Sequence, residues 1–452
     1  MIIDRSQPPA PAAVRDFTFP EIARSELGNG LALLAAPQGT LPVVTFRLMV
    51  HAGAEHDTPR YAGLAQLTAD VLEAGTATRS ADRLAWAFEL LGAELDVDIM
   101  WDYAALTVTV AADRVEAALA LLAEVVLEPA LDPREIERLK NEQLAELLQR
   151  ESEPRALASD QAIRFIFSQD SPYHRPVPGL RDSVRALSAE AVHTHYDNTW
   201  RADNAALMAV GAIDPATVFD LAARHLDGWS TGGQRVRPAI KSARRNARFH
   251  LVHRAGSVQS EIRAGHVGVP RTHPDYYALT VANSILGGAF TSRLNMNLRE
   301  KNGFTYGVRS GFGFRKQPGP FLIQTAVATD VTARAVEEIW RETTGLLENG
   351  PTADEMTAAR DYLSGTVPLE LQTTEQIAAR AGEIFVFDLP VDYFSLYRDE
   401  LRRVTAEQAW QAARAHIRPD DLVFTIVGDA EALEATIAAL GLGTIEVHQT
   451  HD

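Results

Sequence analysis

The stretch Gly287-Gly-Ala-Phe-Thr-Ser-Arg-Leu-Asn-Met-Asn-Leu-Arg-Glu-Lys-Asn-Gly-Phe-Thr-Tyr-Gly-Val308 carries the most specific pattern in the chain. Its opening small residues, including Gly287 and Gly288, predict a loop. Leu294 and Leu298 then stand four positions apart, which predicts one apolar face of a short helix. The helix is expected to end at Gly303, because glycine readily takes the left-handed backbone found after a helix.

Two polar side chains in this stretch form a candidate binding pair. Arg299 lies in the last turn of the expected helix, and Tyr306 is expected to begin a strand that shares one face with Phe304 and Val308. A guanidinium and a phenol from adjacent elements can together grip a carbonyl or a carboxylate. Structural roles stay open at this point, since an arginine at a helix end complements the helix dipole and a tyrosine in a strand packs.

The string SRLNMNLREKNGFTYGV, from Ser292 to Val308, resembles the C-terminal-half signature of the pitrilysin/insulinase-like zinc peptidases, which include the mitochondrial processing peptidases. In that family the arginine and tyrosine of R-E-x-x-G-x-x-Y hold the substrate backbone near the scissile bond. Arg299 and Tyr306 match those two positions. The resemblance therefore implies that both residues anchor a peptide, with Gly287 and Gly288 allowing its close approach.

The order of elements repeats along the chain. His51-Ala-Gly53 corresponds to His266-Val-Gly268, and two further pairs keep the same spacing of 215 positions: Tyr61 with Tyr276 and Leu64 with Leu279. A spacing this constant predicts two copies of one α+β module, each running strand, helix, helix, strand pair, long helices, final strand and helix.

The repeat and the local composition predict four segments. Residues 1–25 are rich in proline and alanine and are expected to form an arm, followed by a first module at 26–228. A linker at 229–248 is expected where glycine, serine and basic residues replace apolar periodicity, and a second module spans 249–452. Each module is expected to be a mostly antiparallel sheet covered by helices, and the two are expected to form a two-lobed clamshell with a cleft.

Two strand pairs are expected in the first module. Leu31–Ala35 and Val43–Val50 are predicted to pair across the turn residues Pro37-Gln-Gly39. Alternating apolar and acidic residues from Leu95 to Ile99, followed by a second alternating run at Ala105–Ala111, predict another pair with one wet face.

The first module departs from the family where the resemblance places a zinc site. The family motif H-x-x-E-H supplies two histidine ligands and a catalytic glutamate on one helix. At those positions this chain has Gln66, Ala69 and Asp70, while Glu146 stands where a distal glutamate ligand is expected. An amide ligates zinc poorly and alanine supplies no general base, so no cofactor is expected to bind to this chain. Two carboxylates alone make a weak site for a hard cation.

Other functional motifs are missing from the sequence. His193 and His195 point to different faces of one helix, His250 and His253 flank an apolar strand, and no other metal-binding constellation is apparent. There is no nucleophile elbow, Walker loop or dinucleotide fingerprint. Because the chain has no cysteine, disulfides, thiolate metal sites and cysteine nucleophiles are excluded.

Length and charge narrow the class of protein. The 452 residues are 46% hydrophobic, without an apolar run long enough for a membrane span. The net charge of −17 disfavours nucleic acid as a partner and favours a basic peptide. A charged N-terminus indicates no secretion signal, so the expected compartment is the cytoplasm, with the periplasm left open.

The resemblance thus implies one half of a peptidase active site. The chain is expected to be a non-catalytic subunit that positions peptides, inactive alone, for a homologous H-x-x-E-H partner that binds the zinc. One alternative is a scaffold or peptide-binding homodimer without a peptidase role, like the core subunits of a respiratory complex. Another is residual hydrolysis with a non-zinc cation at Asp70 and Glu146, which lacks a base.

Overall fold

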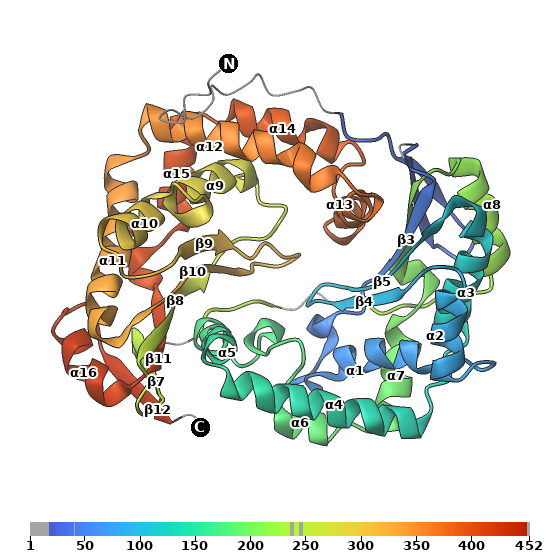
Figure 1. Ribbon diagram of the computed structural model, residues 1–452, viewed down its shortest axis with the longest axis horizontal. Coiled ribbons are helices and arrows are strands. Elements are labelled where there is room, and N and C mark those ends of the chain that lie inside the picture. The colour runs from blue at the N-terminus through green and yellow to red at the C-terminus, as the bar shows by residue number, and fades with distance from the viewer. Residues whose placement is uncertain (1–17, 40, 236–238, 244–246, 450–452) are drawn as a thin grey trace, which may run out of the picture.

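The computed structural model describes residues 18–39, 41–235, 239–243 and 247–449, which form two six-stranded sheets (Figure 1). The first sheet has the order β1-β2-β6-β3-β5-β4 and the second the order β12-β7-β11-β8-β10-β9. The strands of the first sheet are β1 Ala23–Glu26, β2 Ala32–Pro37, β3 Val43–Val50, β4 Leu95–Ile99, β5 Ala104–Ala111 and β6 Ala205–Gly211. Those of the second are β7 Phe249–His253, β8 Gln259–Val267, β9 Val308–Phe312, β10 Pro320–Ala328, β11 Val423–Gly428 and β12 Ile445–Gln449.

The two sheets confirm the predicted repeat. The run β2-β6-β3-β5-β4 corresponds strand by strand to β7-β11-β8-β10-β9. In each run the first pair is parallel and the others are antiparallel. The sheets differ at one edge, where β1 is antiparallel to β2 and β12 is parallel to β7. The expected α+β fold of two modules in two lobes is therefore confirmed.

One predicted strand pair is wrong and one is confirmed. β2 and β3 are not neighbours, because β6 lies between them and pairs with both. Every residue of β6 is buried, so this strand takes a central position with both faces covered. The β4–β5 pair forms as expected.

Helices cover the outside of each sheet (Figure 1). In the described ranges, no helix combines the length and the apolar character that a membrane crossing requires. The helices of the first half are α1 Leu64–Val71, α2 Ala81–Glu89, α3 Val115–Leu127, α4 Pro133–Ser152, α5 Pro154–Ile166, α6 Arg181–Arg185, α7 Ala189–Thr199 and α8 Pro215–Leu226. Those of the second half are α9 Tyr276–Asn283, α10 Arg293–Asn295, α11 Thr332–Asn349, α12 Ala353–Thr366, α13 Thr374–Val386, α14 Tyr393–Arg403, α15 Ala406–His416 and α16 Ala430–Ala438.

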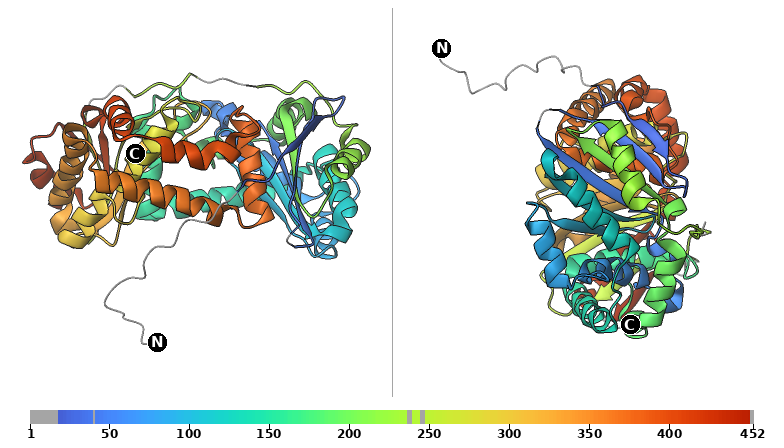
Figure 2. Two further views of the ribbon diagram at one scale, coloured as in Figure 1. Left: turned by 90° about the horizontal axis from the view of Figure 1, so that it is seen from above. Right: turned by 90° about the vertical axis from the view of Figure 1, so that its right-hand side faces the viewer.

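The two halves of the chain exchange helices. α13, from the second half, packs on β3 and β6 of the first sheet, where Ile377 joins Met49 and Met208 in one buried cluster. Reciprocally, α5 of the first half packs on β8 and β11, where Ile166 lies with Val423. Figures 1 and 2 show both helices crossing from their own lobe to the other. Each sheet is thus enclosed between helices of its own half and one helix of the other.

Residues just outside both predicted ends of the first module, 26 and 228, pack in its core. β1 begins at Ala23, inside the stretch expected to be an arm, and Phe19 packs against Phe394 with ring centroids 5.5 Å apart. Residues 1–17 of the predicted arm lie outside the described residues. Trp229, at the start of the predicted linker, is buried and donates its indole N–H to the Trp200 carbonyl.

Candidate substrate-binding segment and metal positions

The segment that carries Arg299 is a π-helical turn at Met296–Lys301, which continues α10. Leu294 and Leu298 are fully buried in the core of the second lobe, as the helical spacing predicts. Gly303 ends the turn with a φ of 64°, so the expected left-handed residue is confirmed. The wider π-helical turn still keeps both leucines on the core side.

Arg299 lies at the surface of this turn. Its guanidinium carbon lies 4.4 Å from the centre of the exposed Phe290 ring, and its Nε lies 3.4 Å from a carboxylate oxygen of Glu300. Because the Arg299 side chain remains 35% exposed, its other N–H groups are accessible to a ligand.

Tyr306 does not begin a strand, so that prediction is wrong. β9 starts two residues later, at Val308, and the Tyr306 side chain is 97% exposed in a bend. The cause is Thr305, whose hydroxyl oxygen accepts a hydrogen bond from the Gly307 N–H at 3.1 Å and one from the Thr325 hydroxyl at 2.9 Å. These bonds fix a local turn before the ladder begins, and the phenol projects into solvent.

The glycine pair is not a loop, since Gly287 and Gly288 close a π-helical turn at Ser284–Gly288. Gly287 is buried, and a Cβ there would lie 2.5 Å from the Ser310 Oγ and 2.7 Å from its backbone nitrogen. Packing of this turn against β9 therefore requires glycine at position 287 even without a bound substrate. Gly288 is exposed. A substrate role for either glycine stays a prediction.

The described residues show no hydrogen bond, ion pair or ring contact between Arg299 and Tyr306. The two side chains stand on the two ends of one short connection, the turn ending at Gly303 and the bend before β9. Arg299 and Tyr306 can therefore act together only on a ligand that contacts both side chains.

The positions of the expected zinc motif lie on α1. Gln66 donates a hydrogen bond to an Asp70 carboxylate oxygen at 2.8 Å, and Ala69 is fully buried. Burial raises the pKa of Asp70 to about 6, with the charges of Glu146 and Glu142 adding to the shift and the Gln66 hydrogen bond opposing it. Asp70 and Glu146 are therefore near enough to interact, as the family resemblance implies, but one Asp70 oxygen already accepts the Gln66 hydrogen bond.

A cavity of about 540 Å³ opens beside Asp70 in the first lobe. Among the described residues that line it are five carboxylates and one arginine, and none is a histidine: Asp70, Glu73, Asp82, Glu89, Glu94 and Arg138. Burial, followed by the charge of Asp70, raises the pKa of Glu73 to about 7. This arrangement attracts cations but offers no nitrogen ligand of the kind that zinc prefers.

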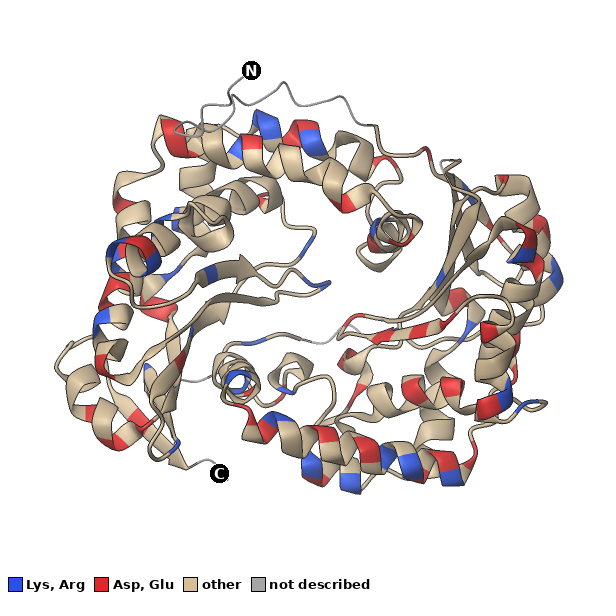
Figure 3. Cartoon of the chain, viewed as in Figure 1, with Lys and Arg blue, Asp and Glu red and all other residues tan. Residues whose placement is uncertain are grey.

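The lobes touch where the β4–β5 and β9–β10 hairpins meet. Asp102 accepts hydrogen bonds from the Tyr173 hydroxyl at 2.7 Å and from the backbone N–H of Lys316 at 3.1 Å. The guanidinium of Arg315 stacks on the rings of Trp101 and Tyr173, at 3.5 and 4.4 Å. Figure 3 shows basic segments at the tip of the β9–β10 hairpin and acidic segments along β4. Opposite charge and aromatic stacking thus join the two lobes internally.

A cavity of about 480 Å³ lies between the lobes at this contact. Both halves of the chain contribute guanidinium groups and aromatic rings to its lining, and the guanidinium groups are those of Arg47, Arg271, Arg315 and Arg380. Arg299 and Tyr306 do not line this cavity. The predicted anchoring pair therefore lies outside this cavity.

The prediction that no other group of metal-ligating side chains comes together is wrong. β12 brings Glu446 and His448 next to His250 of β7, with ligand atoms within 4.8 Å of one another. The sequence signal is the alternation Glu446-Val-His448, which puts a carboxylate and an imidazole on one face of a strand. The spacing alone cannot indicate which strand lies beside it.

The comparisons with known proteins cover most of the chain. Residues 34–177 match the family described as Insulinase (Peptidase family M16), and residues 186–363 match Peptidase M16 inactive domain. The Uncharacterized zinc protease YmxG of Bacillus subtilis (strain 168) is 22% identical over 365 residues, which is 80% of this chain and 87% of the relative. The Non-peptidase homolog YmxG of Helicobacter pylori (strain ATCC 700392 / 26695) is 23% identical over 86% of this chain and 90% of its own.

Two further relatives extend the comparison. The mitochondrial Cytochrome b-c1 complex subunit 1 of Bos taurus is 26% identical over 272 residues, covering 60% of this chain and 56% of its own length. The crystal structure of a peptidase M16 inactive domain from Pseudomonas fluorescens superposes with a TM-score of 0.85 at 26% identity, over 90% of this chain and 98% of that structure.

Proposed function

The chain belongs to the peptidase M16 family, and from that premise we propose that it is a subunit that positions peptide substrates for a zinc-bearing partner without cleaving them itself. The partner is a homologous chain with an intact H-x-x-E-H motif. In this proposal no catalytic zinc binds at Gln66, Ala69 and Asp70, since an amide, a methyl group and one carboxylate replace the two imidazoles and the general base.

The observation that carries the proposal is the exposure of Tyr306. A tyrosine that is 97% exposed on a turn fixed by Thr305 and Thr325 contributes little to the stability of the fold. Such an amphipathic ring, presented uncovered on a fixed turn, suits contact with another molecule. Arg299, at the other end of the same connection, keeps N–H groups accessible for a peptide carbonyl.

The outer edge of the adjacent strand, β9, is already occupied by other parts of the second lobe. β9 is an edge strand of the second sheet, but on its outer side the Val308 N–H donates to Asn295 Oδ1 and the Ser310 carbonyl accepts from the Asn283 side-chain amide, each at 3.0 Å. An extended peptide that added to this edge through main-chain hydrogen bonds would have to displace both contacts. In this proposal the peptide is therefore held by the Arg299 and Tyr306 side chains rather than by strand pairing at Val308. The chain's net charge of −17 favours basic peptides.

The contact between the lobes favours a second candidate function, that of a scaffold without a peptidase role. Asp102, Tyr173 and Arg315 join the hairpins inside the molecule, and the cavity there is only about 480 Å³. The relative from Helicobacter pylori is named a non-peptidase homolog, and the bovine relative is a subunit of a respiratory complex. A closed molecule that binds a partner through its outer faces fits this alternative.

Substitution at the anchoring pair tests the proposal. In a complex reconstituted with an H-x-x-E-H homologue, Arg299→Ala is expected to lower kcat/KM for peptide cleavage by about 100-fold, as when one hydrogen-bond donor to the reacting group is removed. Tyr306→Phe is expected to lower it too, and the double variant should show less than the product of both effects if the residues hold one bound group.

Assembly is measured in the same samples by size-exclusion chromatography with light scattering. Arg341→Ala is the matched control, because Arg341 is a 55% exposed arginine on α11. Unchanged assembly with reduced cleavage only in the Arg299 and Tyr306 variants supports substrate positioning. Equal loss of assembly and cleavage means that the two residues are structural, and unchanged cleavage favours the scaffold.

A further inference from the structure

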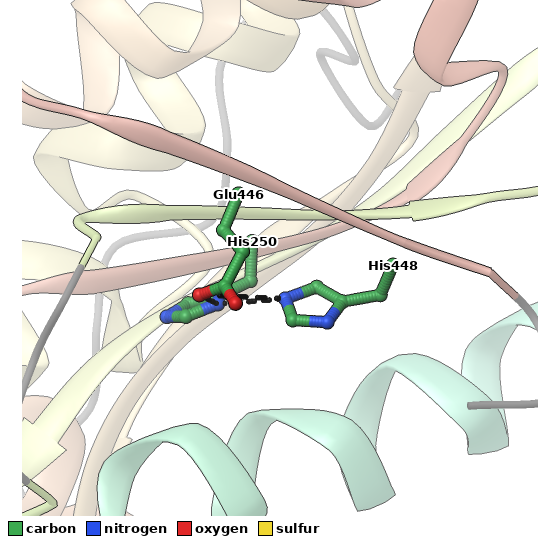
Figure 4. A group of neighbouring side chains, drawn as sticks. All are labelled: His250, Glu446 and His448. Atoms are coloured by element: carbon green, nitrogen blue, oxygen red, sulfur yellow. Dashed lines mark hydrogen bonds and ion pairs between the residues drawn. The ribbon is translucent and has the colours of Figure 1, made fainter.

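The strand register at the end of the second sheet brings three metal-ligating side chains together. β12 lies parallel to β7, with Glu446 beside His250. His448 follows Glu446 by two residues and therefore points to the same face of the sheet. Figure 4 shows the Glu446 carboxylate next to the facing ring nitrogens of both histidines.

The separations of the ligand atoms allow one zinc ion to reach all three. His250 Nδ1 lies 3.0 Å from His448 Nε2 and 3.6 Å from Glu446 Oε2, and the third side of this triangle is 4.0 Å. A point about 2.1 Å from all three atoms lies at the centre of such a triangle, and zinc binds histidine nitrogen and carboxylate oxygen at about 2.0–2.2 Å. A zinc ion therefore fits without movement of the backbone.

The kinds of donor atom narrow the choice of metal. Two imidazole nitrogens and one carboxylate oxygen suit zinc and its transition-metal neighbours, whereas calcium and magnesium prefer oxygen ligands alone. With no metal bound, His250 and His448 face each other across one hydrogen bond, which needs a proton on one of the two nitrogens. A cation can take the place of that proton and bind both lone pairs.

The surroundings hold the two rings in position. Phe165 of α5 stacks on the His250 ring, with centroids 3.9 Å apart and planes at 5°, and its centroid lies 4.8 Å from that of His448. The His250 ring also hydrogen-bonds to the backbone of Ala247. Such contacts fix ring orientation and keep an imidazole available for a metal. Because Phe165 belongs to the first half of the chain, the helix exchange itself builds one wall of this site.

One side of the cluster opens into a cavity of about 450 Å³. Asp170 and His174 are among its lining residues. A zinc ion held by three protein ligands keeps a fourth position. Because His250, Glu446 and His448 all line this cavity, water or an added ligand can reach an ion bound by them.

A second cluster in the same lobe has ring nitrogens that are already engaged in other bonds. His273, Asp275 and His416 also lie within 4.8 Å of one another. However, His273 Nδ1 accepts the backbone N–H of Asp275 at 3.1 Å, and His416 Nε2 pairs with the Asp275 carboxylate at 2.8 Å. Because the lone pair of His273 Nδ1 already accepts a hydrogen bond, this cluster serves as the matched control for zinc binding.

We propose that His250, Glu446 and His448 form a zinc-binding site that clamps the last strand, β12, onto β7 and leaves one coordination position open to the adjacent cavity. This site departs from the expectation that the chain binds no cofactor. It is also independent of the proposed positioning function, because it uses neither Arg299 nor Tyr306 and lies at the opposite edge of the second sheet from β9.

The test uses the full-length chain without an affinity tag, stripped with chelator and titrated with zinc against a chromophoric competitor. The expected result is one tightly bound equivalent. His250→Gln and His448→Gln should each weaken binding by about 100-fold or more, since loss of outer-shell partners alone costs 10–100-fold. His416→Gln should leave the affinity unchanged.

Hydrogen exchange supplies a second readout on the same samples. Zinc should slow the exchange of β12 amides in the unsubstituted chain and not in His448→Gln. Glu446→Gln, at a more exposed position, is a milder variant that preserves folding and should also weaken binding. Absence of tight zinc binding, or its retention in both histidine variants, overturns the inference. Loss of the ion in Asp70→Asn, with binding kept in His448→Gln, places it in the first lobe and overturns it as well.

Discussion

The exchange of helices between the lobes makes a quantitative prediction at Ile377. This residue is fully buried, and it belongs by sequence to the second half but by packing to the first sheet. Ile377→Ala removes three carbons, worth about 0.8 kcal/mol each in transfer free energy, and leaves a cavity between α13 and β3. The expected loss in the free energy of unfolding is about 3 kcal/mol, inside the range of about 2–5 kcal/mol for such truncations.

Two measurements check this prediction. Urea denaturation gives the loss in the free energy of unfolding, and hydrogen exchange followed by mass spectrometry locates it. Because Ile377 covers β3 and β6, amides of both strands should exchange faster in the variant, although they lie more than 150 residues away in the sequence.

Ile339→Ala is the control, because Ile339 is equally buried but lies in the core of the second lobe on α11. It should destabilise the chain by a similar amount while local exchange rises in the second sheet. If Ile377→Ala leaves the protection of β3 and β6 unchanged, the exchanged packing is wrong.

Two further predictions concern stability. Burial, followed by the charge of His56, lowers the pKa of His195 to about 3. Between pH 6.5 and pH 3, therefore, only the unfolded chain binds a proton at this residue. Acidification from pH 7 to pH 5 should lower the free energy of unfolding by about 2 kcal/mol through His195. In urea titrations at both pH values, His195→Gln should lose that part of the pH dependence, whereas substitution of the exposed His193 on the same helix should not. Gly287→Ala should lower the free energy of unfolding by about 1–3 kcal/mol because its Cβ meets Ser310. Gly345→Ala, in open space on α11, should raise it by up to about 1 kcal/mol, and thermal unfolding of both variants checks the contrast.

The sequence predicts the architecture well because the internal repeat is visible in it. A constant spacing between His51 and His266, and between Tyr61 and Tyr276, requires equivalent elements in both halves, and the two sheets keep the same strand order. The apolar run at Ala205–Gly211 is typical of a buried strand, and β6 is one. It could not indicate that the covering helix, α13, comes from the other half, because apolar patterning does not specify its partner.

The misjudged site residues have local and long-range causes. Tyr306 fits a strand by its alternation with Phe304 and Val308, but the hydroxyl of Thr305 fixes a turn that alternation does not reveal. His250 and His448 are separated by most of the second module, and only the parallel pairing of β7 with β12 brings them to hydrogen-bonding distance. Such a register depends on tertiary packing.

The central claim concerns division of labour between two chains, and peptide cleavage tests it most directly. The rate is measured for this chain alone, for an H-x-x-E-H homologue from the same organism alone, and for their equimolar mixture. The account predicts that this chain is inert and that the mixture cleaves faster than the homologue by itself. Cleavage by this chain alone, or no gain on mixing, contradicts it.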